Sequence, residues 1–350
     1  MAIDKVTSAA ITDGTITSSD LASGAVQNQS AFKNIIINGD MSQAQRSTSE
    51  TGITGAGYAT LDRFRLGGSV PGTWTWSQST TVPTGQGFAK SMKIDCTTAE
   101  GSLGASDTMY FQHKIEGQNL QYLKKGTSSA ESLTLSFWVR SAKTGTYIAM
   151  LFDNDNNRHI SKSYTISSAD TWEKKTITYD GDTTGAFDND NASSLEVWLW
   201  LAAGSNNSSG TLATSWASTT NANNAVGQVN LADSTSNDFY ITGIQLEAGT
   251  SASDFEFLPH DVNRDRCERY YTTGAARAEG YRGTAGVVKS MINFRKTMRS
   301  SPSISHSSIG NDNVGSYSNE ITSDGFGYKI VSSTSGNTYQ NSTYAANAEL

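Results

Sequence analysis

Long stretches of the chain alternate between apolar and polar residues with a period of two, the spacing of a β-strand with one buried face. In Ser132–Arg140 every second residue is apolar, and Leu195–Leu201 shows the same alternation. Other runs expected as strands are Ile35–Ile37, Leu61–Leu66, Thr73–Ser79, Ala89–Cys96, Gly145–Asp153, His159–Ile166, Trp172–Tyr179, Asp238–Glu247 and a last short run holding Phe255 and Phe257. The glycine inside Asp238–Glu247 is typical of a β-bulge.

No helical period of ten or more residues lies between these runs, so βαβ units are not expected. About ten antiparallel strands joined by polar turns predict a two-sheet sandwich of the jelly-roll type over residues 34–260. One short helix is expected at Gln118–Leu123. The polar segment 203–233 is too long for an ordinary turn, and Trp216 in its middle is the expected anchor that holds it down.

The two ends of the chain differ from this central domain. Residues 1–33 form an extended leader in which isolated apolar residues recur every five positions, a spacing that fits neither a helix nor a strand. Such a segment either becomes ordered against a partner or a neighbouring copy, or stays a loose tail. Its candidate attachment residues are Val6, Ile11, Ile16, Leu21 and Val26.

Beyond the sandwich, residues 261–280 are expected to connect it to a second domain, with one short helix over 261–271. Residues 281–350 are expected to form a smaller β domain of four or five strands. The fold class predicted for the whole chain is therefore all-β, with an extended leader, a jelly-roll-like sandwich and a small C-terminal β domain.

The composition supports a strand-rich protein, since Ser, Thr, Asn and Gly supply 145 of the 350 residues. The 33 aromatic residues argue against disorder throughout. A net charge of −7 and the absence of a strongly basic stretch argue against a nucleic-acid partner. Cys96 and Cys267 are expected as free thiols, and no signal peptide or membrane span is visible, so we expect synthesis in a cytoplasm.

Catalytic motifs are not evident in the sequence. The four histidines are scattered, and no HExxH zinc motif, GxSxG elbow, P-loop or dinucleotide fingerprint occurs. A pair of carboxylates from distant strands would still suffice for glycoside hydrolysis, and sequence spacing does not test that. We therefore assign no catalytic residue and expect a protein that is not an enzyme.

One short turn occurs twice, as Phe-Asp-Asn-Asp-Asn at 152–156 and at 187–191. Clustered oxygen ligands suit a hard cation, which makes Ca²⁺ the candidate metal and Asp153, Asp155, Asp188 and Asp190 its candidate ligands. Neither copy has the spaced acids, glycine and closing glutamate of a defined calcium loop. Asp and Asn are also favoured in tight turns for backbone reasons, so plain turns are the alternative.

Two tryptophan pairs occupy alternate positions of a strand, Trp74 with Trp76 and Trp198 with Trp200. Each pair therefore shares one face of its strand, and the second pair lies opposite Val197, Leu199 and Leu201. Exposed aromatic platforms bind sugars by ring stacking, which makes these four residues candidates for glycan binding. The alternative is that they pack in the core or between chains.

Several motifs, taken in order, resemble a module of tail-fibre and other virion structural proteins of tailed phages, especially phages of marine bacteria and cyanobacteria. They begin with NIIINGDMSQAQR (34–46) and YATLDRFRL (58–66) and continue over the sandwich, covering about 34–271. The remaining motifs are LTLSFWVRSAKTGTY (133–147), TWEKKTITYDGDTTGAFDNDN (171–191), NDFYITGIQLEAGTSASDFEF (237–257) and RCERYY (266–271). The ending, with MRSSPSIS (298–305) and then DGF, resembles the small β domain that closes such fibres.

The resemblance implies a non-enzymatic virion fibre protein, commonly a homotrimer, that joins tail or capsid proteins through its leader. It also implies contact between the distal β domains and a host-surface polysaccharide. Two other functions stay open: an architectural head fibre or capsid decoration that binds no glycan, and a virion-associated depolymerase.

Overall fold

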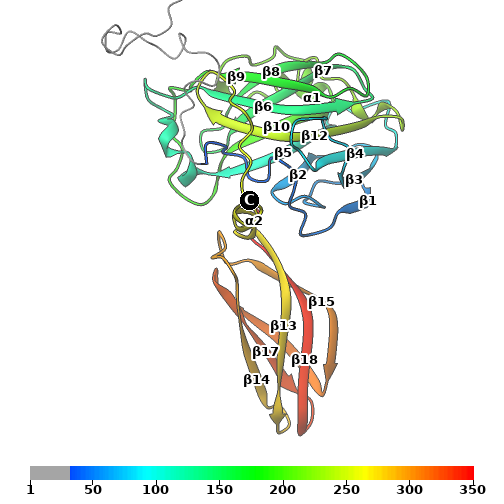
Figure 1. Ribbon diagram of the computed structural model, residues 1–350, viewed down its shortest axis with the longest axis vertical. Coiled ribbons are helices and arrows are strands. Elements are labelled where there is room, and N and C mark those ends of the chain that lie inside the picture. Colours follow the sequence, from blue (N-terminus) through cyan, green and yellow to red (C-terminus); the bar gives the residue numbers. More distant parts are fainter. Residues whose placement is uncertain (1–31) are drawn as a thin grey trace, which may run out of the picture.

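The structure, a computed structural model, describes residues 32–350. The candidate attachment residues Val6, Ile11, Ile16, Leu21 and Val26 lie outside this range. The described chain forms a broad β-sandwich and a slender C-terminal β domain, with helix α2 (His260–Glu268) between them (Figure 1).

Two six-stranded antiparallel sheets build the sandwich. Sheet A has the order β1-β3-β4-β12-β6-β9 and sheet B the order β11-β8-β7-β10-β5-β2. The strands of sheet A are β1 (Ser49–Ile53), β3 (Thr73–Ser79), β4 (Ser91–Thr98), β6 (Leu133–Ser141), β9 (Glu173–Tyr179) and β12 (Asp238–Ala248). Those of sheet B are β2 (Phe64–Gly68), β5 (Thr108–Glu116), β7 (Gly145–Asp153), β8 (Arg158–Ile166), β10 (Ser193–Ala203) and β11 (Ala217–Ser218).

The chain repeatedly crosses from one sheet to the other, for example from β4 in sheet A to β5 in sheet B and back to β6. Such crossings let the inner faces of both sheets share one core. The predicted all-β class with an antiparallel sandwich and a smaller C-terminal β part is confirmed.

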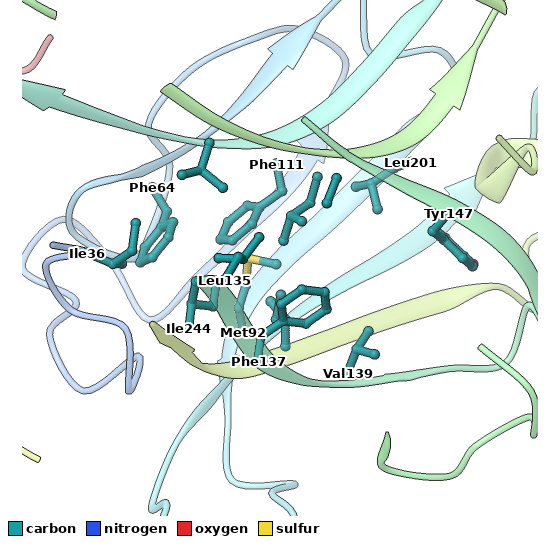
Figure 2. Close-up of a cluster of buried hydrophobic side chains, with 14 of the residues drawn as sticks. Ile36, Phe64, Met92, Phe111, Leu135, Phe137, Val139, Tyr147, Leu201 and Ile244 are labelled. Carbon is teal, nitrogen blue, oxygen red and sulfur yellow. The ribbon is translucent and has the colours of Figure 1, made fainter. Parts of the chain in front are cut away.

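The core lies between the two sheets, where the apolar residues of each period-two pattern point inward (Figure 2). Leu135, Phe137 and Val139 of β6 are fully buried, as the alternation predicts. From sheet B, Phe64 and Phe111 stack with ring centroids 4.7 Å apart. Burial of such large side chains supplies the main driving force for the sandwich.

Two expected strands are not strands. Ile35–Ile37 is buried but irregular, because the Asn34 side chain accepts the Ile36 N–H and donates to the Ile244 carbonyl in place of a ladder. Phe255 and Phe257 lie in an irregular segment, and their rings pack on the ring of Phe88. Here side-chain hydrogen bonds and an aromatic cluster, rather than strand pairing, hold the backbone.

The bulge predicted in β12 is confirmed. The pairing between β12 and β6 shifts register between Thr242 and Gln245, and Gly243 between them has a φ of +64°. The Phe88 ring occupies the space that a Cβ at Gly243 would take. Glycine is required there both by the left-handed backbone and by this close approach.

The expected helix at Gln118–Leu123 is present as two 3₁₀ turns, Gly117–Asn119 and Gln121–Leu123. The segment 203–233 holds α1 (Ser205–Ser208), strand β11 and two further 3₁₀ turns, Asn221–Asn223 and Leu231–Asp233. Among residues 32–350 no helix has the length and apolar character needed to cross a membrane.

Two three-stranded sheets face each other in the C-terminal domain, with orders β13-β18-β15 and β14-β17-β16. Their strands are β13 (Tyr271–Arg282), β14 (Val287–Asn293), β15 (Ser303–Asp312), β16 (Val314–Ile321), β17 (Gly325–Ser332) and β18 (Gly336–Asn347). Because β13 starts at Tyr271, the second half of the expected connector 261–280 is instead the first strand of this domain. Strand β13 is not evident from the sequence, because its residues TTGAARA include no large apolar side chain.

Buried ion pairs join the two domains. Arg63, fully buried in the sandwich, pairs with the Glu349 carboxylate near the end of the described chain, and Arg46 reaches the same carboxylate at 3.1 Å. Cys267 of α2 packs with Ile37 and Tyr270 in a small apolar cluster beside them. Both cysteines are buried and unpaired, as predicted.

Candidate functional site

The outer face of sheet B is covered at one end by the segment 204–230. Ala225 and Leu212 of this segment pack on Trp200, Ile148 and Met150. Trp200 is consequently only 1% exposed. The expectation that Trp200 forms part of an open platform is therefore wrong, because the covering segment occupies the space a sugar would need.

Trp216 holds this covering segment in place. Its indole N–H donates to the Asp180 carbonyl at 2.7 Å, and its ring packs against the edge of the core. The anchoring role predicted for Trp216 is confirmed.

Trp198 belongs to the same outer-face cluster but is partly exposed. Its ring is parallel to that of Tyr110, at 4.1 Å between centroids and 2° between planes. Phe152 packs on it at 5.4 Å. Both neighbours belong to adjoining strands of sheet B, β5 and β7, so three strands contribute one aromatic stack.

Polar side chains surround this stack, and Glu196 is at their centre. Its carboxylate accepts hydrogen bonds from the indole N–H of Trp198 at 2.7 Å and from the amide of Gln112, and the Lys114 ammonium lies 3.5 Å away. Cross-strand pairing places Gln112 beside Trp198 and Lys114 beside Glu196. We call this set, Tyr110, Gln112, Lys114, Phe152, Glu196 and Trp198, the Trp198 patch.

A glycine makes the stack possible. Gly67 of β2 pairs with Tyr110, and a Cβ at Gly67 would lie 2.1 Å from the Tyr110 ring. The ring therefore lies over bare backbone and is fixed against Trp198 on its other side. Burial, with a contribution from the Glu196 carboxylate, raises the pKa of the Tyr110 hydroxyl, which stays a neutral hydrogen-bonding group.

The other tryptophan pair is in the core. Trp74 and Trp76 of β3 are both 0% exposed, and Trp76 packs edge-on against Phe111 at 6.1 Å. The Trp74 indole N–H donates to the Pro71 carbonyl. The two rings share a face, as the alternation predicts, but that face points inward, so their assignment to glycan binding is wrong.

The two Phe-Asp-Asn-Asp-Asn turns meet in space, although they are far apart in sequence. The Asp155 carboxylate accepts the Asp188 backbone N–H at 2.9 Å, and the Asn156 amide donates to the Ala186 carbonyl. The Asp190 carboxylate accepts the Ala192 N–H within its own turn. The Asp190 carboxylate therefore closes its own turn, the Asp155 carboxylate links the two turns, and Asp188 takes part through its backbone N–H, which favours the alternative interpretation of the repeat as plain turns.

The remaining candidate ligand, Asp153, is fully buried and binds a lysine. The Lys125 ammonium lies 2.5 Å from Asp153 and 3.2 Å from Asp182, and it donates to the Thr184 and Gly185 carbonyls. Burial disfavours ionisation of Asp182, yet hydrogen bonds from Arg158 and the charge of Lys125 hold its pKa below the usual range. A cation is thus supplied by the chain itself, and in residues 32–350 no group of three or more acids, histidines or cysteines is placed to hold a metal.

Sequence reasoning missed Tyr110 and Lys125. Tyr110 belongs to β5, whose inward positions Met109, Phe111 and Ile115 alternate clearly and signal a strand. With β5 recognised, Tyr110 becomes a candidate for the outer face. Lys125 gives no such signal, because its partners lie 28 and 57 positions further along the chain.

The chemistry available at the Trp198 patch is recognition. It offers the partly exposed rings of Tyr110 and Trp198 next to the Lys114 ammonium, groups that bind the apolar face and the hydroxyls of a sugar. Glu196 is the one carboxylate within the patch, and its oxygens are already held by Trp198, Gln112 and Lys114.

Distant structural similarity is what comparisons with known proteins give. No family model matches this sequence, and no curated protein matches it. Among solved structures, the chain is similar to the enzymatically active domain of tailspike protein 4 of Bacteriophage CBA120, with 15% identity and a TM-score of 0.32. That match covers 62% of this chain and 22% of the tailspike chain, so this chain spans less than a quarter of its length.

Two carbohydrate-binding modules match this chain with similarly low sequence identity and TM-score. One is a CBM4 structure, with 12% identity, a TM-score of 0.30 and coverage of 60% of this chain and 97% of that one. The other is the family 11 carbohydrate-binding module of the cellulase Lic26A-Cel5E of Clostridium thermocellum, with 13% identity, a TM-score of 0.27 and coverage of 58% and 97%. These values assign no substrate or activity to this chain.

Proposed function

We propose that this chain is a structural protein of a phage virion that binds a host-surface polysaccharide through the Trp198 patch. Residues 1–33 attach it to tail or capsid proteins, and the sandwich carries out no covalent chemistry. Its partners are virion proteins, a glycan and further copies of itself, not nucleic acid. The motif resemblance over residues 34–271 supports the virion part of this proposal.

The observation that carries the glycan part is the aromatic stack of Tyr110, Trp198 and Phe152 beside Glu196 on the outer face of sheet B. Aromatic surface that stays in contact with water is unfavourable, so covering the exposed part of Trp198 and its neighbours with a ligand ring is favourable. The segment 204–230 buries Trp200 but leaves Trp198 partly exposed. A sugar ring would cover the rest, with its hydroxyls bonding to the partly exposed Lys114, while the buried Gln112 and Glu196 hold Trp198 and Lys114 in position.

The test is binding of the full chain to an array of bacterial surface glycans, compared with Trp198→Ala and Tyr110→Ala. Both variants should lose at least about tenfold in affinity, or about 1.4 kcal/mol, for the glycan that the wild type binds best. The control is Trp172→Ala, which removes a partly buried tryptophan that packs on Tyr240 instead. Full binding by Trp198→Ala, or no binding by the wild type to any glycan, contradicts the glycan proposal and leaves the architectural function.

Self-association is the second part of the proposal, as a homotrimer. Among residues 32–350, seven of the ten exposed large apolar side chains belong to the C-terminal domain: Tyr281, Val287, Met291, Ile309, Tyr317, Ile321 and Tyr339. Met291 is 64% and Tyr281 is 68% exposed. A surface this apolar on a small domain favours burial against other copies.

A further inference from the structure

A cavity of about 370 Å³ lies at the junction between the sandwich and α2. Its walls come from the end of β5, the 3₁₀ turns that follow it, the start of the described chain and α2. It adjoins the Trp198 patch, because Lys114 of β5 belongs to both. Its volume is in the range of sites that hold small ligands.

The cavity is lined by three cations, and two of them already have partners. Lys114 lies 3.5 Å from Glu196. Arg269 makes a two-pronged contact with Glu116, at 2.8 Å to each carboxylate oxygen. These pairs leave no free charge for a ligand.

Arg266 is different, because within residues 32–350 it forms no ion pair. One terminal nitrogen, Nη1, is buried without a hydrogen-bond partner, and Nη2 makes one long contact of 3.4 Å with the Asn34 carbonyl. The nearby Glu256 carboxylate is occupied by the Phe32 and Asn34 backbone N–H groups. Burial of this guanidinium without an anion is unfavourable, which lowers the pKa of Arg266.

An aromatic wall stands at the mouth of the cavity. Tyr122 is 51% and Phe32 is 54% exposed, and both line the cavity. Asn119 and Gln118, also exposed, add amides on the same side. Exposed aromatic rings, amides and one half-buried guanidinium without an ion pair fit a ligand with an apolar face, hydroxyls and a carboxylate.

We propose that the junction cavity binds a carboxylate-bearing sugar, a uronate residue of the polysaccharide. Arg266 pairs with the carboxylate, Tyr122 packs on the sugar ring, and Asn119 bonds to hydroxyls. This inference rests on the proposed function for its polysaccharide, but it concerns different residues and a different ligand group.

The experiment is titration calorimetry of the full chain with trigalacturonate and with galactotriose, which differ in their carboxylates. The wild type should bind trigalacturonate at least about tenfold more tightly, since a charge-assisted pair contributes about 1.5 kcal/mol or more. Arg266→Gln should abolish this preference. Tyr122→Ala should weaken the binding of trigalacturonate, and because Tyr122 is at the surface this variant should fold normally.

Two control variants remove a nearby positive charge outside the cavity lining. The first is Arg264→Gln, at a residue of the same helix that pairs with Glu268. Glu268 would still have Arg295, 3.6 Å away, as a partner. The second is Lys124→Ala, at a residue two positions after Tyr122 whose side chain pairs with Glu131 at the surface. Both should keep the preference for trigalacturonate.

The results separate this inference from the proposed function. Equal binding of the two trisaccharides by the wild type, or a preference that survives in Arg266→Gln, overturns the uronate site. Displacement of trigalacturonate by an equal concentration of acetate also overturns it, because the cavity would then hold a simple anion. Trp198→Ala should leave the preference unchanged, whereas loss of the preference in that variant would place the carboxylate at the Trp198 patch.

Discussion

At the scale of single residues, Lys125 stabilises the fold as a buried ammonium shared by two aspartates. Lys125→Met would leave Asp153 and Asp182 facing each other across a buried site with only Arg158 to compensate. Breaking a buried ion pair in this way costs about 3–5 kcal/mol. Urea unfolding should show that loss, while the neighbouring surface variant Lys124→Met should change stability by less than about 0.5 kcal/mol.

The same geometry makes a prediction about calcium. Because an ammonium and backbone N–H groups already hold the carboxylates of Asp153, Asp155 and Asp190, millimolar Ca²⁺ or EDTA should leave the melting temperature unchanged. A calcium-dependent rise of several degrees in a thermal scan would instead mean that the ion displaces Lys125 and binds these turns.

His113 gives the junction a dependence on pH. Its ring is fully buried, its Nε2 accepts the Ile37 N–H, and burial together with the charges of Arg63 and Arg266 holds its pKa well below 6.5. The unfolded chain therefore binds a proton below about pH 6.5 that the folded chain does not. Stability present above that pH is lost as the pH falls.

Comparison with His113→Gln isolates this effect, because glutamine offers an acceptor without a titrating group. Between pH 6.5 and 5 the wild type should lose stability relative to the variant, by at most about 1.4 kcal/mol per pH unit. Urea unfolding at several pH values measures both curves. Parallel curves would show that His113 is protonated in the folded protein.

The residue pattern predicts which side chains share one face of a strand, but not whether that face is buried or exposed. The sequence places Trp198 and Trp200 opposite Val197, Leu199 and Leu201, and the structure agrees. Which tryptophan stays exposed depends on where the segment 204–230 lies, and no local pattern determines that. Trp74 and Trp76 show the same limit, because alternation does not say which face of a strand meets the core.

At the scale of elements, the pairing of β2 with β5 holds the Trp198 patch together. Gly67→Ala would push a methyl group into the Tyr110 ring, which must move away from Trp198. We expect about tenfold weaker glycan binding and a loss of about 1–3 kcal/mol in stability from overpacking. Gly55→Ala, at a position with open space around its Cβ, is the matched control and should change neither quantity.

Strands with clear alternation, such as β6 and β10, were predictable within a few residues. Ile35–Ile37 was not, because the Asn34 side chain takes the backbone hydrogen bonds that a strand would make. Strand β13 was missed since its glycines and alanines carry little apolar signal, yet Ala276 and Ala278 are buried against the opposite sheet.

At the scale of the whole molecule, the apolar surface of the C-terminal domain predicts self-association. Light scattering at micromolar concentration should give about three times the 37.4 kDa of one chain. Met291→Glu with Tyr281→Glu should shift the mass to that of a monomer, because both side chains are exposed and their charge opposes burial. Arg277→Glu, a charge change at an exposed polar position, is the control, and a monomeric wild type would contradict the trimer.

The central claim is that a polysaccharide contacts the sandwich at the Trp198 patch. The most direct measurement is a crystal structure of the full chain with the oligosaccharide that it binds best on the array. The account predicts a sugar ring against Tyr110 and Trp198, with a hydroxyl bonded to Lys114. Sugar density elsewhere on the molecule, with the Trp198 patch empty, would contradict it.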